Sequence, residues 1–69
     1  MNFRYQGSSG DLLTSFRVEP GIYIPAVGEL VSLESDDVER NFKVVDRWYT
    51  YVGFEGKLLQ QIITVVVTD

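Results

Sequence analysis

The densest group of ionisable side chains is a run of carboxylates formed by Glu34, Asp36, Asp37 and Glu39. Paired carboxylates can do acid–base work where burial or a charged neighbour shifts their pKa. This run lies in a polar connection between two predicted strands, where nothing would supply such a shift. Its spacing also differs from that of an EF-hand loop, which weakens the alternative of divalent-cation binding. We interpret it as a solvated acidic loop.

Histidine and cysteine are both absent from the chain. The commonest general base and the most reactive nucleophile are therefore missing, as are the usual zinc ligands. The run Gly7-Ser8-Ser9-Gly10 offers backbone N–H groups to an anion, but such a run more often forms a tight turn. No phosphate-binding glycine motif is present. We expect a protein that is not an enzyme and has no catalytic residue, cofactor or metal site.

Basic and aromatic side chains share one segment, in the manner of small barrels that stack nucleic-acid bases. They are Arg40, Lys43, Arg47, Trp48, Tyr49 and Tyr51. Attraction to phosphate dominates such binding, whereas this chain has six basic residues, ten acidic residues and a formal charge of −4. Asp46 also interrupts the series. Binding of single-stranded nucleic acid is therefore an alternative and not the main hypothesis.

Alternating apolar and polar residues predict five strands. They are expected near residues 3–5, 12–18, 30–33, 41–52 and 58–68. Turns are expected at residues 7–11 and after residue 18, and an extended edge segment at residues 22–24. Ser35 is placed to cap one helical turn, with Asp36 and Asp37 at its N-terminus.

The last two predicted strands form a long hairpin, and a four-residue loop at residues 53–56 would set Val52 opposite Lys57. One face is then a core face that holds Phe42, Val44, Trp48, Leu59, Ile63, Val65 and Val67. We expect Trp48 to anchor this core. Asp46 falls on the same face, where a lone carboxylate is costly, so we predict a β-bulge near residues 44–46 that turns Asp46 outward.

The opposite face of this hairpin is apolar and aromatic as well. It holds Val45, Arg47, Tyr49, Tyr51, Leu58, Gln60, Ile62 and Val66. Because tyrosine, tryptophan and arginine are enriched at interface hot spots, this face predicts a protein-interaction surface. We place that surface at Arg47, Tyr49, Tyr51, Leu58, Gln60 and Ile62. The opposing interpretations are that these side chains only cover a twisted hairpin, or that the N-terminal hairpin folds over them.

A chain of 69 residues forms a single domain, residues 1–69, with a thin margin of stability. Small domains usually need an additional source of stability, such as a disulfide, a structural metal or oligomerisation. Without cysteine or histidine, oligomerisation is the source that remains. The apolar stretch at residues 62–67 has the length of a strand and not of a membrane span. Residues 1–6 contain no apolar region of a signal peptide. We therefore expect a cytoplasmic protein without a membrane partner.

Two strings of residues carry a family resemblance. They are Ile24-Pro25-Ala26-Val27-Gly28-Glu29-Leu30-Val31-Ser32-Leu33 and Phe42-Lys43-Val44-Val45-Asp46-Arg47-Trp48-Tyr49. The pattern resembles small SH3-like β-barrel proteins, many of them uncharacterised products of bacteria or mobile elements. The resemblance covers roughly residues 24–68 and follows turn and barrel geometry. It implies a fold and carries over no functional residue.

These observations together predict an all-β meander of five strands that closes into a small SH3-like or partly open barrel. We expect a long C-terminal hairpin and at most one short helical turn. The expected function is that of a non-catalytic protein-interaction or assembly module that self-associates, as a homo-oligomer or with a protein partner, and that is encoded on a phage or other mobile element. The alternatives are a small barrel that binds single-stranded nucleic acid and an acidic mimic that blocks a basic site on another protein.

Overall fold

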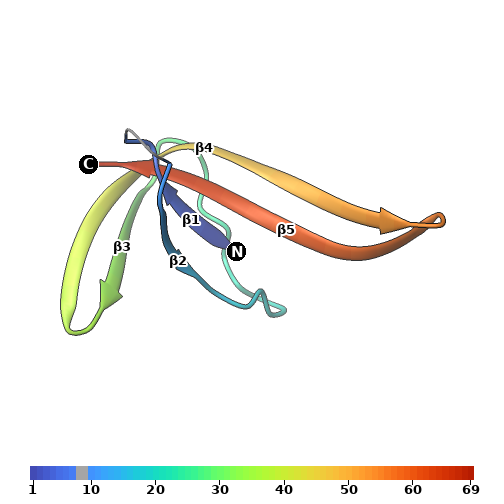
Figure 1. The fold of residues 1–69 in the computed structure, drawn as a ribbon. Coiled ribbons are helices and arrows are strands. Elements are labelled where there is room, and N and C mark those ends of the chain that lie inside the picture. The colour runs from blue at the N-terminus through green and yellow to red at the C-terminus, as the bar shows by residue number, and fades with distance from the viewer. Residues whose placement is uncertain (8–9) are drawn as a thin grey trace.

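The computed structural model describes residues 1–7 and 10–69. These residues contain five strands and no helix. The strands are β1 (Asn2–Tyr5), β2 (Leu12–Ser15), β3 (Leu30–Ser35), β4 (Val38–Phe54) and β5 (Lys57–Thr68). They form one curled sheet in the order β2-β1-β5-β4-β3 (Figure 1). The edge strands β2 and β3 do not pair with each other, so the barrel is open between them. The predicted all-β, five-stranded, partly open barrel with a long C-terminal hairpin is confirmed.

The connectivity differs from the simple meander that the sequence predicted. Strands β3, β4 and β5 do follow one another as antiparallel neighbours. Strand β1, however, pairs in parallel with β5, with Asn2 opposite Thr64 and Tyr5 opposite Val67. The N-terminal hairpin therefore extends the sheet and does not fold over it. The turn expected at residues 7–11 and the candidate anion cradle at residues 7–10 include residues 8–9, which lie outside the described part of the chain.

Both long hairpins turn through only two residues. Asp36 and Asp37 have φ values of 53° and 63°, and Glu55 and Gly56 have φ values of 49° and 76°. Positive φ at both central positions is the signature of the type I′ turn, whose twist matches that of the flanking strands. The helical turn expected after Ser35 is therefore wrong. The four-residue loop expected at residues 53–56 is also wrong, because β4 continues to Phe54 and β5 begins at Lys57.

The predicted bulge is present and reorganises the long hairpin. Val44 lies opposite Val67 and Asp46 lies opposite Val66, which leaves Val45 as the extra residue. Asp46 is exposed, as expected. Beyond the bulge the alternation of β4 is inverted, because one added residue exchanges the two faces of a strand.

The core lies on one face of the curled sheet and draws on β1, β4 and β5. Its buried residues are Phe3, Phe42, Val44, Ile63, Val65 and Val67, and partly buried neighbours include Met1, Tyr5, Leu13, Ile24, Val31 and Leu33. Two predicted members are wrong, since Trp48 is 45% exposed and Leu59 is 65% exposed. Trp48 pairs with Thr64 on the outer face because the bulge lies before it. Leu59 lies beyond the end of the core.

The connection between β2 and β3 is fastened by Glu29. Its carboxylate accepts hydrogen bonds from the Ala26 amide and, at 2.8 Å, from the Tyr23 hydroxyl. These two hydrogen bonds hold the pKa of Glu29 below its usual value, and the bond from Ala26 has the larger effect. The same carboxylate raises the pKa of Tyr23 above its ordinary value. The contact therefore requires an ionised Glu29 and a protonated Tyr23.

The inverted face of β4 predicts a small role for Trp48 in stability. We expect Trp48→Ala to lower the free energy of unfolding by about 1 kcal/mol or less, because its side chain already lies half in water. Phe42→Ala should cost about 3–5 kcal/mol. Urea unfolding followed by circular dichroism measures both changes. The single tryptophan of the chain should also emit as an exposed indole, and a blue-shifted emission in the dilute native protein would contradict the assignment.

The Glu29 contact predicts a specific loss of stability in acid. A carboxyl whose pKa is lowered by folding stabilises the folded state above its ordinary pKa, here 4.5, and loses that contribution as the pH falls through its folded value. The melting temperature of Glu29→Gln should therefore fall less on acidification than that of the unmodified protein. Glu39→Gln, which removes an exposed carboxylate from the β3–β4 hairpin, is the matched control. Identical pH profiles for all three proteins would exclude this role of Glu29.

Candidate interaction surface

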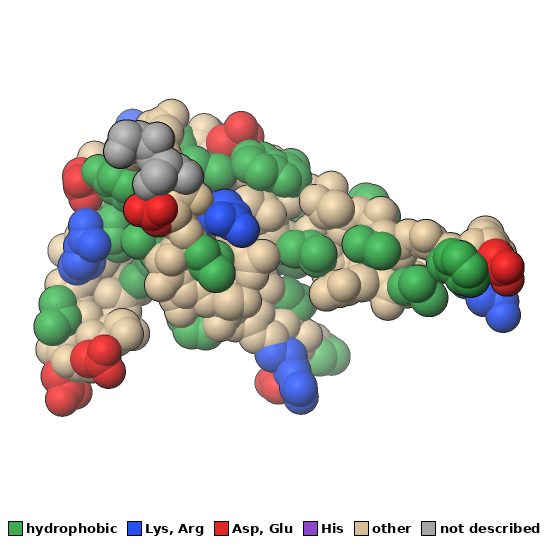
Figure 2. All heavy atoms as spheres, in the orientation of Figure 1, with side chains coloured by type: hydrophobic (Ala, Val, Ile, Leu, Met, Phe, Trp, Pro, Cys, Tyr) green, Lys and Arg blue, Asp and Glu red, His purple; other side chains and the backbone are tan. Residues whose placement is uncertain are grey.

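The most exposed apolar feature of the molecule is the far end of the β4–β5 hairpin, residues 49–62, which we call the arm. Strand β4 pairs with β3 only up to Lys43, and β5 pairs with β1 only from Thr64 onward. The arm consequently projects from the body as a two-stranded ribbon (Figure 1). Its large exposed side chains are Tyr49, Tyr51, Val52, Phe54, Leu58 and Leu59. Hydrophobic side chains are visible along its length and charged ones at its tip (Figure 2).

The residues of the predicted interaction surface all lie on or beside the arm, but they do not share one face. Arg47 and Tyr49 lie opposite Val65 and Ile63, and therefore on the same face as the core. Tyr51 follows on that face. Gln60 lies opposite Val52 and Ile62 lies opposite Thr50, which places both on the other face. Leu58 lies opposite Gly53, next to a second register shift near the tip.

Arg47 has an intramolecular role that the sequence did not reveal. Its guanidinium donates hydrogen bonds to the carbonyl oxygens of Ile24, at 3.2 Å, and Pro25, at 3.1 Å. Pro25 is buried and Ile24 packs against the core. Arg47 therefore fastens the β2–β3 connection over the open face of the sheet. The Asp46 carboxylate accepts a hydrogen bond from the Arg47 backbone N–H and not from the guanidinium.

The basic and aromatic series is divided by the same bulge. Trp48 lies on the face opposite Arg47 and Tyr49, together with the exposed Asp46. The guanidinium of Arg40 lies 4.8 Å from the ring centroid of Phe42 and 3.6 Å from the Asp69 carboxylate. That carboxylate also accepts a 2.6 Å hydrogen bond from Tyr5. The two arginines thus have partners within the chain, and the series presents no continuous basic surface.

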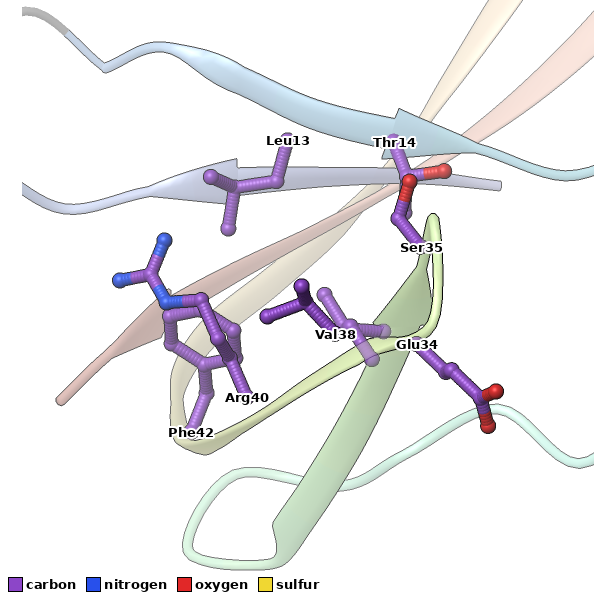
Figure 3. A pocket seen from close by; sticks show the side chains of 8 residues that line it. Leu13, Thr14, Glu34, Ser35, Val38, Arg40 and Phe42 are labelled. Carbon is purple, nitrogen blue, oxygen red and sulfur yellow. The ribbon is translucent and has the colours of Figure 1, made fainter.

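A second apolar feature, which the sequence does not predict, is the opening between β3 on one side and β2 with the β2–β3 connection on the other. We call it the mouth. Leu33 and Glu34 line two adjoining pockets there, of about 130 and 420 Å³. The smaller is lined from β2 by Leu13 and Thr14 and from the β3–β4 hairpin by residues such as Val38 (Figure 3). The larger is lined by Met1, Phe3, Phe16, Ile22, Tyr23, Pro25, Val31 and Ser32 in addition.

The acidic run lies on the lip of this mouth. Asp36 and Asp37 form the tight turn, and Glu34 lies opposite Glu39 on the paired strands. All four are exposed. Across residues 1–7 and 10–69, no three side chains of His, Cys, Asp or Glu come together as a candidate metal site. The mouth is hard to predict from sequence because its walls come from opposite edges of the sheet. Those edges face each other only because the sheet curls.

The Arg47 contact predicts that the β2–β3 connection loosens when the guanidinium is removed. Arg47→Met keeps an apolar stem but leaves two carbonyl oxygens without their charged donor, at a cost of about 1–3 kcal/mol in the free energy of unfolding. Chymotrypsin should then cleave faster after the exposed Tyr23. Arg17→Met, an exposed arginine in the same connection, is the control. Unchanged stability and unchanged cleavage in Arg47→Met would contradict the role of Arg47.

Comparison of the chain with protein-family models, with curated proteins and with solved structures gave no match. None of the described residues belongs to a helix long and apolar enough to span a membrane. The functional interpretation therefore depends on the geometry of the arm and of the mouth.

Proposed function

We propose that this protein is a non-catalytic assembly module that self-associates through its arm. The observation that supports the proposal is the exposure of a two-stranded ribbon that is apolar on both faces. Such a ribbon is marginally stable alone in water, and an exposed apolar patch of this kind favours a covering partner. Tyr51, Phe54, Leu58 and Leu59 are each more than 60% exposed.

The charges of the arm favour a protein over nucleic acid as its partner. Glu55 and Lys57 are the only charged residues between positions 49 and 62, so the arm is formally neutral. Nucleic-acid binding depends on several cations that neutralise phosphates, and the arm offers one. The whole chain has a formal net charge of −4, so two copies repel each other overall. The arm is formally neutral and adds nothing to that repulsion when a second copy binds there.

Single-stranded nucleic acid is the second candidate function, because Trp48 is exposed and is available to stack on a base. Asp46 lies on the same face of β4, however, and the nearest basic residue of β4 on that face is Lys43, which lies before the bulge. We therefore rank it below self-association.

The mass of the protein in solution tests the main proposal. We expect light scattering at tens of micromolar to give a multiple of the 7.9 kDa chain mass. Tyr51→Glu should reduce the mass to one chain while the β-sheet circular dichroism spectrum is kept, because a charge would be desolvated at the contact. Val27→Glu, which places the same charge on an exposed valine outside the arm, should leave the assembly intact.

A monomer mass for the unmodified protein at this concentration would overturn the proposal. Equal dissociation by Tyr51→Glu and Val27→Glu would also count against it, since the loss would then follow from net charge and not from the arm.

A further inference from the structure

The arm and the mouth are incomplete in complementary ways. The arm presents apolar side chains that nothing in its own chain covers. The mouth presents an apolar hollow of about 420 Å³ lined by β1, β3 and the β2–β3 connection. A smaller hollow lies beside it between the edge strands β2 and β3, each of which lacks a second neighbour. The larger hollow is apolar and open to solvent, so side chains of a second molecule can reach it.

The position of the arm prevents it from filling the mouth of its own chain. The arm extends from the β4–β5 pair at the centre of the sheet, whereas the mouth lies between the two outer strands. The ribbon points away from the body, and the whole molecule, arm included, extends 42 Å along its long axis (Figure 1). An arm can therefore reach a mouth only on another copy.

Charge also favours this pairing of surfaces over a contact between two arms. Asp36 and Asp37 form the turn at the lip of the mouth, and Glu34 and Glu39 pair beside them on the outer face of the β3–β4 hairpin. Lys57 lies at the tip of the arm, where it would approach these carboxylates. Two arms laid side by side would leave the acidic lip without any such partner.

We propose that the arm of one copy docks in the mouth of the next, in a head-to-tail contact between two different surfaces. This inference rests on the proposed function, because it names the partner surface for the same arm. A head-to-tail contact is not satisfied by two copies: each dimer keeps one free arm and one free mouth, and growth continues until a ring closes or a filament forms.

A complementation experiment tests the mode of contact. Leu58→Glu disables the arm, and Val38→Glu disables the mouth at an exposed lining residue. Each variant alone should be monomeric by light scattering, with an unchanged circular dichroism spectrum. Their equimolar mixture should give a particle of twice the chain mass and no larger, because only one intact arm and one intact mouth remain. Ile22→Glu, in the larger pocket, serves as a second mouth variant if Val38→Glu does not fold.

The outcomes separate this inference from the proposed function. A monomeric unmodified protein overturns both. Assembly that is lost in Leu58→Glu but kept in both mouth variants leaves self-association standing and overturns the docking of arm in mouth. A mixture of the two variants that stays monomeric overturns it as well.

The absence of cysteine from the chain allows a direct check by cross-linking. Leu58→Cys and Val38→Cys are prepared with tags of different mass, mixed with unmodified protein and oxidised. A disulfide between the two variants supports the proposal, because it requires an arm residue within about 7 Å, Cα to Cα, of a mouth residue of another copy. Disulfides that form mainly between two Leu58→Cys chains indicate arm-to-arm contact and overturn it.

Discussion

The single extra residue in β4 determines which way the far half of the molecule faces. Without it, Asp46 would lie on the core face beside Val44, where an unpaired carboxylate costs several kcal/mol. The bulge at Val45 directs the Asp46 side chain toward solvent. Every following residue of the strand then lies on the opposite face from the one it would otherwise occupy. Trp48 is thereby moved to the outer surface, and Arg47 and Tyr49 are moved above the core.

The position of Arg47 follows from that exchange and explains how so small a sheet covers its apolar face. A curled sheet of five strands has no second layer, and here the β2–β3 connection lies over the open face instead. Its carbonyl groups at Ile24 and Pro25 receive the Arg47 guanidinium, while Glu29 fixes Tyr23 and Ala26. An irregular segment can cover a core in this way only if its backbone groups find such partners.

The sequence predicts the strands and the bulge better than it predicts register and face. Alternation and the cost of burying Asp46 are local signals, and both lead to correct conclusions. The register depends on whether the tip turns through four residues or two, and Glu55 is an unusual residue for the left-handed conformation that a two-residue turn requires. The bulge that turns Asp46 outward also moves Trp48 to the outer face, whereas the sequence-based assignment of faces leaves Trp48 in the core. The parallel pairing of β1 with β5 joins the two ends of the chain and has no local signal at all.

The arm and the body are unequally stabilised by the chain itself. Buried side chains end at Ile63, and positions 49–61 are all exposed, so the arm is held mainly by its own cross-strand pairs. Contacts of that kind contribute roughly 0.2–1 kcal/mol each, which is close to the entropy cost of ordering the residues that make them. Any partner that binds the ordered arm shifts this local balance in proportion to the logarithm of its concentration. Order in the arm and association of the chain are therefore expected to be one coupled equilibrium, while the body folds independently of both.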